Sequence, residues 1–165
     1  MKNRLFLICP ASQTESLIKE QYGQEVFFLT ALGAVFNFQE INYVETLEDF
    51  LKREAIDEVI IVSDSSCPFI KSVLEQEKGF DTKAEQVLRD LLVDNYATVM
   101  AGDSLADKKK NMAKLNIQRQ ADDILSNELL LSPITQSQIR IKGLVTTKEK
   151  GQLEEVKLTL KELNQ

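Results

Sequence analysis

The chain has 165 residues, of which 43% are hydrophobic and 28% charged, and these proportions indicate a single globular domain over residues 1–165. Six glycines, three prolines and two cysteines exclude a disordered, collagen-like or disulfide-stapled chain. The net charge of −6 offers no electrostatic footprint for nucleic acid, so we expect no nucleic-acid partner. The sequence contains no histidine, which excludes every catalytic or metal site that needs an imidazole.

The apolar run at residues 5–9 is too short for the core of a signal peptide, and no run approaches the length that spans a bilayer. Two cysteines, Cys9 and Cys67, are too few for the disulfide framework of a secreted protein. We therefore expect a cytoplasmic protein with reduced thiols and no transmembrane segment.

Short apolar runs typical of buried strands occur three times in the first half of the chain. They are residues 5–9, 26–30 and 59–62. The segments between them are predicted to be helical. One helix covers residues 15–22 and ends near Gly23, and another begins at Thr46, whose hydroxyl is expected to cap it.

The second half of the chain is more helical. Apolar residues at helical spacing mark two helices: Ala84, Val87, Leu88, Leu91 and Leu92 in the first, and Ile117, Ala121, Ile124 and Leu125 in the second. The three lysines at 108–110 are expected to form a solvated stretch before the second helix. Alternating apolar residues then predict two strands, at 139–145 and 156–160, which the turn at 148–151 joins.

Buried strands separated by amphipathic helices indicate an α/β fold. We expect a mainly parallel central sheet flanked by helices, with an antiparallel hairpin strand at its C-terminal end.

Strand ends locate the candidate site, because ligands of open α/β sheets bind beyond the carboxyl ends of the strands. Cys9 ends the first strand, and Asp64 and Cys67 follow the third. If these strands are neighbours, two thiolates and one carboxylate converge, and such ligands can hold Zn²⁺. The alternative is that both cysteines are buried apolar residues, which is a common fate of free cysteine.

Five motifs follow one another along the chain. They are Cys-Pro-Ala-Ser-Gln at 9–13, Thr-Ala-Leu-Gly at 30–33, Ser-Asp-Ser-Ser-Cys at 63–67, Asn-Ile-Gln-Arg-Gln at 116–120 and Ile-Arg-Ile-Lys-Gly-Leu-Val at 139–145. In this order and at this spacing, the chain resembles the β-class carbonic anhydrases, zinc enzymes that hydrate CO₂ to bicarbonate. The resemblance covers nearly the whole chain and implies the fold of that family.

The same resemblance assigns residues to the family's metal site. Its zinc ligands are Cys, His and Cys, and these positions hold Cys9, Asp64 and Cys67 here, so the resemblance implies a possible Zn²⁺ cofactor on these three residues. The family's Asp–Arg pair, which orients the zinc-bound water, is replaced by Ala11 and Gln13, so no catalytic residue is expected at those two positions. A carboxylate in place of imidazole weakens the Lewis acidity of zinc, and efficient CO₂ hydration is therefore not expected.

A ligand pocket is expected around the same strand ends. Its residues would be Ser12, Thr30, Gly33, Ser63, Ser65 and Ser66. Each has a plainer interpretation: the serines can be ordinary turn residues, Gly33 can serve a tight turn, and Asp64 can cap the helix that begins near Cys67.

Three hypotheses about function follow from these residues. The first is a pseudoenzyme that keeps the carbonic anhydrase fold, forms a homodimer and binds a protein partner or a small anion. The second is a zinc enzyme with a Cys-Asp-Cys site, a lyase of the carbonate dehydratase type or a hydratase of another small substrate. The third is a redox-responsive protein in which Cys9 and Cys67 form a reversible disulfide.

Overall fold

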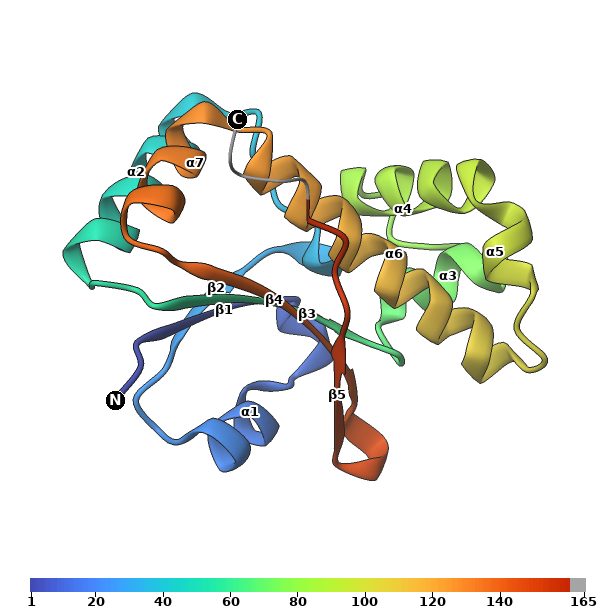
Figure 1. Cartoon of the computed structure of the whole chain (residues 1–165). Helices are drawn as coiled ribbons and strands as arrows, with labels where there is room; N and C mark the ends of the chain where they lie inside the picture. Colours follow the sequence, from blue (N-terminus) through green and yellow to red (C-terminus); the bar gives the residue numbers. More distant parts are fainter. Residues whose placement is uncertain (161–165) are drawn as a thin grey trace.

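The computed structural model describes residues 1–160 and contains a five-stranded sheet of order β2-β1-β3-β4-β5 (Figure 1). The strands are β1 (Arg4–Ile8), β2 (Phe27–Thr30), β3 (Glu58–Asp64), β4 (Arg140–Thr147) and β5 (Gln152–Val156). All neighbouring pairs are parallel except β4 and β5, which form an antiparallel hairpin. The α/β class, the mainly parallel sheet and the C-terminal hairpin predicted from the sequence are confirmed. The predicted single domain extends to residue 165, and residues 161–165 lie outside the described part.

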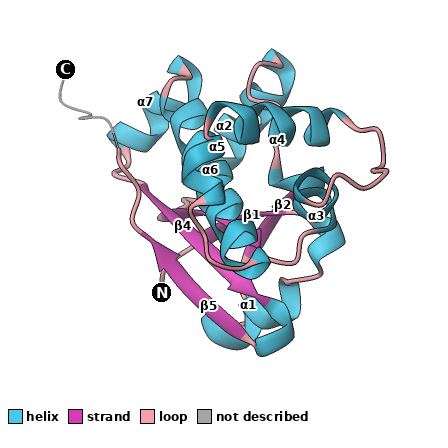
Figure 2. Ribbon diagram, turned by 90° about the vertical axis from the view of Figure 1, so that its right-hand side faces the viewer, coloured by secondary structure: helices cyan, strands magenta, loops and turns pink. Residues whose placement is uncertain are grey.

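Helices connect the strands and cover both faces of the sheet. They are α1 (Glu15–Tyr22), α2 (Ile41–Arg53), α3 (Pro68–Leu74), α4 (Lys83–Asp94), α5 (Tyr96–Met100), α6 (Leu105–Leu125) and α7 (Glu128–Gln136), with short 3₁₀ turns at Pro10–Ser12, Leu32–Ala34 and Lys148–Lys150. Helix α1 lies alone on one face, and the other helices lie on the opposite face (Figures 1 and 2). None of the helices in residues 1–160 is long and apolar enough to cross a membrane.

Strands β1 and β3 are buried on both faces, which explains why they appear in the sequence as nearly continuous apolar runs. Alternate side chains enter two separate cores, because successive residues of a strand point to opposite faces. Leu7 and Ile61 belong to the larger core beneath α6, whereas Phe6 and Ile60 belong to the smaller core beneath α1. At Gly143 a Cβ atom would come within 2.6 Å of Ile117 Cγ2, so the absence of a side chain lets α6 lie close to β4.

Two expectations about the first half of the chain were wrong in detail. Strand β2 is half-buried rather than buried, because it pairs only with β1 and forms the edge of the sheet. Helix α2 begins five residues before Thr46, and its cap is Glu40, whose carboxylate accepts hydrogen bonds from the backbone N–H groups of Asn42 (3.1 Å) and Tyr43 (2.7 Å). The Thr46 hydroxyl instead donates to the carbonyl of Asn42.

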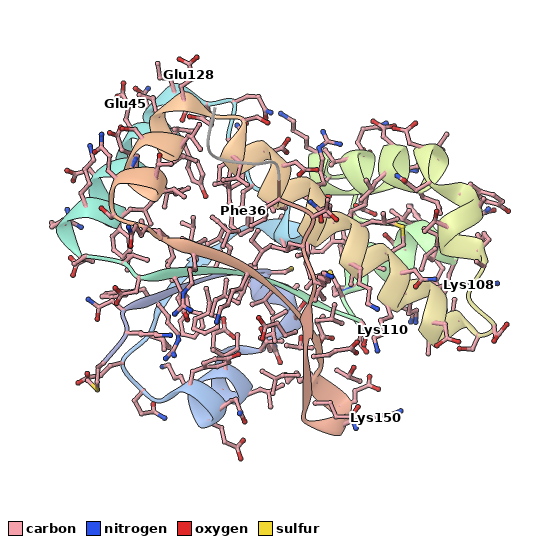
Figure 3. All side chains as sticks on the ribbon, in the orientation of Figure 1. Phe36, Glu45, Lys108, Lys110, Glu128 and Lys150 are labelled. Carbon is pink, nitrogen blue, oxygen red and sulfur yellow. The ribbon has the colours of Figure 1, made fainter. Side chains whose placement is uncertain are left out.

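The three lysines at 108–110 lie inside α6 rather than before it. Ser104 begins this helix by accepting a hydrogen bond from the Asp107 backbone N–H at 3.1 Å. Lys109 then approaches Glu75, and Lys110 forms an ion pair with Glu154 of the hairpin (Figure 3). Through these ion pairs, the polar residues in the first turns of α6 find partners on neighbouring elements.

The last strand also begins earlier than expected. Strand β5 ends at Val156, so Leu158 and Leu160 lie beyond it. The chain after β5 is held against α6 by Gln118, whose side-chain amide exchanges two hydrogen bonds with the backbone of Thr159, at 3.0 and 2.9 Å. Leu158 packs against the core beneath α6, whereas Leu160 is exposed.

Candidate functional site

The carboxyl ends of β1, β3 and β4 meet at one edge of the sheet. Strands β1 and β3 are parallel neighbours, with Leu7 opposite Ile61. Cys9 follows β1 directly, and Cys67 is the N-cap residue of α3 after β3. The condition for the predicted convergence of the two cysteines is therefore met.

The two cysteines form a buried thiol pair. Cys9 and Cys67 are both free, and their residues are only 4% and 1% exposed. The neighbouring Cys67 thiol lowers the pKa of Cys9, and a hydrogen bond from the Gly33 N–H (Sγ···N 3.2 Å) acts in the same direction against burial. The neighbouring Cys9 thiol, together with burial, raises the pKa of Cys67. One proton thus tends to stay on Cys67 while Cys9 takes thiolate character.

Gly33 places its N–H group on Cys9 by means of a left-handed backbone conformation. Its φ is 67°, and a Cβ atom at this position would lie 3.2 Å from the Cβ of Ala84, so a side chain would meet both strain and crowding. Asn116 of α6 fixes the loop by donating from Nδ2 to the carbonyls of Gly33 and Ala34, each at 3.1 Å. The predicted tight-turn role of Gly33 agrees with this geometry.

Asp64 ends β3 and is only 3% exposed. Its Oδ1 accepts hydrogen bonds from Thr146 Oγ1 at 2.7 Å and from the Lys148 N–H at 3.0 Å, and its Oδ2 accepts one from the Ser66 N–H at 2.9 Å. The carboxylate therefore connects the end of β3 to the end of β4 and closes the turn before α3. This arrangement is close to the capping role weighed for Asp64, although the N–H groups belong to residues outside the helix.

The residues present do not form a three-ligand zinc site. Within residues 1–160, no three His, Cys, Asp or Glu side chains are grouped so that they could hold a metal ion. Catalytic zinc sites in proteins use three protein ligands. Cys9 and Cys67 supply two sulfur atoms, whereas the Asp64 carboxylate is held by three donors.

A cavity of about 310 Å³ opens beside this edge. It is lined by Ala11, Ser12, Gln13, Asp64, Ser66, Lys148 and Glu149. Lys148 Nζ reaches across the cavity to Gln13 Oε1 at 3.3 Å. The Ser12 hydroxyl is buried and has no hydrogen-bond partner within the described part of the chain.

The structure brings some of the predicted pocket residues together and separates others. Ser12 and Ser66 line the cavity, whereas Thr30 is exposed at the end of β2. Ser63 is buried in β3, and the Ser65 hydroxyl donates to Thr147 Oγ1 at 3.4 Å.

Sequence reasoning missed Lys148 and Glu149 as cavity residues. The sequence did predict the hairpin turn that contains both residues. That turn lies beside the cavity because β4 pairs in parallel with β3, and the pairing of these two strands could not be predicted from the sequence.

Comparisons with known proteins agree with this architecture. A family model described as carbonic anhydrase matches residues 5–153. No curated protein matches the chain in sequence.

Several solved structures are similar to the chain. The β-carbonic anhydrase CafA of Aspergillus fumigatus has a TM-score of 0.79 at 16% identity, with 94% of this chain and 75% of that chain covered. The Coccomyxa β-carbonic anhydrase in complex with acetazolamide has a TM-score of 0.75 at 20% identity, over 94% and 72%. One of two tetrameric β-carbonic anhydrases from Sordaria macrospora has a TM-score of 0.77 at 15% identity, over 94% and 80%. At these identities the likeness shows the fold alone.

The sheet order, the C-terminal hairpin and the cysteines at the strand ends define an α/β protein of the β-carbonic-anhydrase type. Because the family model matches most of the chain, the chain belongs to the β-carbonic anhydrase family.

Proposed function

We propose that this family member is a pseudoenzyme that acts by binding instead of hydrating CO₂ at zinc. The observation that carries the proposal is the bonding of Asp64, which occupies the position of the family's histidine ligand. Three donors hold its carboxylate at 2.7–3.0 Å. Turning it toward Cys9 and Cys67 would leave these donors without their partner, and buried unpaired donors are costly.

The residues at the other expected catalytic positions support the same proposal. Ala11 offers only a methyl group, and the Gln13 amide is hydrogen bonded to Lys148. Neither side chain can take up or release a proton near neutral pH, so neither can act as a general acid or base. The chain has no histidine that could replace them.

The charge of the cavity favours a protein partner over a free anion as its ligand. Its lining holds one cation, Lys148, against the carboxylates of Asp64 and Glu149. A small anion would meet net repulsion there, whereas a partner can present an acceptor to Lys148 and a donor to Glu149 together.

The proposal is tested by measuring zinc content and the rate of CO₂ hydration on one preparation from zinc-supplemented cells. We expect far less than one zinc per chain and a hydration rate equal to that of buffer, because only two thiols are free to bind a metal. The Cys67→Ser variant is the matched control. About one zinc per chain, lost in this variant and accompanied by hydration above background, would establish the zinc-lyase alternative with Cys9, Asp64 and Cys67 as ligands.

A thiol redox response is a second candidate function, and the buried Cys9–Cys67 pair favours it. In this reaction the Cys9 thiolate attacks diamide, and the Cys67 sulfur then displaces the reduced reagent as a disulfide forms. Formation of one disulfide removes two hydrogen atoms from the two thiols, and diamide takes them up to become the hydrazine.

This second candidate predicts that diamide oxidises both thiols of the folded protein. When the treated chain is then unfolded and titrated, the number of free thiols should fall from two to none, and the mass of the chain should fall by that of two hydrogens. The Cys67→Ser variant should instead form a mixed adduct at Cys9 or stay reduced. Two thiols that persist after treatment of the folded protein would exclude a redox function.

We also propose a homo-oligomer, a homodimer in the simplest case. The Sordaria macrospora structures are described as tetrameric, which supports self-association in this fold. The molecular mass in solution at low concentration tests this proposal, and a strict monomer would contradict it. The cytoplasmic location stays a prediction that agrees with two free thiols.

A further inference from the structure

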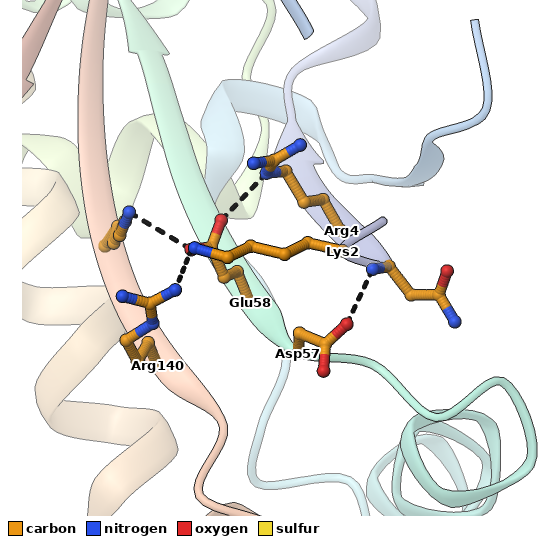
Figure 4. A network of polar contacts seen from close by, with 7 residues as sticks. Lys2, Arg4, Asp57, Glu58 and Arg140 are labelled. Atoms are coloured by element: carbon orange, nitrogen blue, oxygen red, sulfur yellow. Dashed lines mark hydrogen bonds and ion pairs between the residues drawn. The ribbon is translucent and has the colours of Figure 1, made fainter. Parts of the chain in front are cut away.

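The amino ends of the strands carry an unusual cluster of charges, opposite to the edge that holds the cysteines. Glu58 begins β3 and its side chain is only 1% exposed. Its Oε2 accepts a hydrogen bond from Arg4 Nε at 2.8 Å (Figure 4). Its Oε1 is contacted by Arg140 Nη2 at 2.8 Å and by Lys2 Nζ and Lys142 Nζ, each at 3.2 Å. One carboxylate is therefore surrounded by four cations.

These four cations exceed what the carboxylate can balance. Against the single charge of Glu58 they leave a surplus of three positive charges, in a protein whose net charge is −6. Like charges held this close repel one another. Three of the cations still reach solvent, since the side chains of Arg140, Lys2 and Lys142 are 55%, 46% and 32% exposed.

Two other carboxylates lie near the cluster, Asp57 and Glu155, but within residues 1–160 neither forms an ion pair with any of the four cations. Asp57 accepts a hydrogen bond from the backbone N–H of Asn3 at 2.7 Å. Within residues 1–160, Arg140 and Lys142 form ion pairs with no acid other than Glu58. Their remaining N–H groups are therefore available to a second anion.

Lys2 and Arg4 also border a cavity of about 510 Å³. Tyr22 and Glu25 line it too, and the Arg4 guanidinium lies over the Tyr22 ring at 5.3 Å from its centre. Arg140 and Lys142 of β4 do not line this cavity. An anion held by these two side chains would therefore lie outside the cavity, on the solvent side of Glu58.

We propose that Lys2, Arg4, Arg140 and Lys142 form a binding site for a phosphate group, carried by inorganic phosphate or by a small phosphorylated molecule. A guanidinium binds two oxygens of a phosphate in a planar fork, and lysine adds a flexible point charge. A phosphate dianion removes two of the three surplus charges, whereas a single carboxylate removes only one. Glu58 holds the four cations together and limits their repulsion.

This site is separate from the cysteine edge. Strand β1 begins at Arg4, and Cys9 follows its other end, so the two sites lie at opposite ends of the same strands. The phosphate site can therefore be tested while the thiol pair and its cavity stay intact.

The test is isothermal titration of the full-length protein with inorganic phosphate and, separately, with pyrophosphate, at constant ionic strength set by chloride. We expect saturable binding with a Kd on the order of 1 mM or tighter, and tighter binding of pyrophosphate. The Arg140→Gln variant should weaken binding about tenfold, because a charge-assisted bidentate contact is lost while an exposed side chain is changed. The matched control is Lys150→Gln at the hairpin turn, which alters the net charge equally and should change the affinity little (Figure 3).

The Glu58→Gln variant should have the opposite effect on phosphate affinity from Arg140→Gln. It raises the surplus from three positive charges to four, so phosphate should bind several-fold more tightly if the variant folds. If this variant does not fold, the double variant Lys2→Gln, Arg140→Gln replaces it and should abolish binding. No saturable phosphate binding in the wild-type protein, or equal weakening by Arg140→Gln and Lys150→Gln, would overturn the proposal.

Discussion

At the scale of single residues, Glu58 and Asp64 show that the neighbours of a buried carboxylate decide what it does. Both lie on β3, one at each end, and both are almost fully buried. Glu58 is surrounded by charged donors, whereas Asp64 is held by a hydroxyl and two backbone N–H groups. Glu58 thus forms ion pairs with cations at one edge of the sheet, and Asp64 stabilises the turns at the other edge by hydrogen bonds.

The bonding of Glu58 predicts a pH dependence of stability. Burial raises its pKa, but the hydrogen bonds from Arg4, Lys142 and Lys2 together lower it to about 2, below its ordinary value of 4.5. Because the folded-state pKa lies below that of the unfolded chain, the ionised side chain stabilises the fold above pH 4.5, and this stabilisation is lost as the pH falls toward 2.

Urea unfolding of wild type and Glu58→Gln at several pH values between 3 and 7 checks this prediction. We expect the variant to be less stable at pH 7 by roughly 1.5–3 kcal/mol, the range for hydrogen bonds to a charged group, and the gap to narrow toward pH 3. A gap that stays constant across this range would show that the ionisation of Glu58 does not contribute.

At the scale of elements, helix α6 positions the loop that contacts Cys9, although the two segments are far apart in the sequence. Asn116 holds the carbonyls of Gly33 and Ala34, and Gln120 accepts a hydrogen bond from the Phe36 N–H at 3.0 Å. These contacts fix the loop that directs the Gly33 N–H at Cys9. A buried polar face of one helix therefore sets the geometry of a loop far away in the sequence.

Substitution of Asn116 tests this role of α6. Asn116→Ala should lower the free energy of unfolding by roughly 1–3 kcal/mol, because two buried carbonyls lose their donor. It should also make Cys9 less reactive toward a thiol reagent, because a displaced Gly33 N–H no longer favours the thiolate. Asn111→Ala on the same helix is the control, since its amide bonds only the carbonyls of Thr98 and Val99 near the surface. Equal thiol reactivity in the two variants would argue against a positioning role for Asn116.

The elements that could be predicted from the sequence are those with a strong apolar pattern. Buried runs identified β1 and β3, and helical spacing identified α4 and the second half of α6. The starts of α2 and α6 were missed for different reasons. Glu40 is an uncommon cap, and the first turns of α6 carry lysines whose partners lie on other elements.

At the scale of the whole molecule, the topology places both cysteines at one edge, which the sequence predicted on the condition that the first and third strands are neighbours. The bonding of Asp64 could not be predicted, because it depends on the register that sets Asp64 opposite Thr146. Register between distant strands leaves no mark in a single sequence. The cluster around Glu58 was missed for the same reason, since its cations come from β4 and from two positions near the start of β1.

We propose that the molecule has a carbonic anhydrase fold whose metal site lacks its third ligand. The two thiols are retained, so restoring an imidazole at position 64 should restore a complete ligand set. The Asp64→His variant keeps Cys9 and Cys67 and changes only the residue that Thr146 and the two N–H groups now hold.

The most direct measurement is therefore the zinc content per chain of wild type and Asp64→His, prepared identically from zinc-supplemented cells and analysed for metal. We expect far less than one zinc in wild type and about one in the variant. About one zinc per wild-type chain, lost on Cys67→Ser substitution, would instead make Asp64 a metal ligand and refute the loss of the metal site.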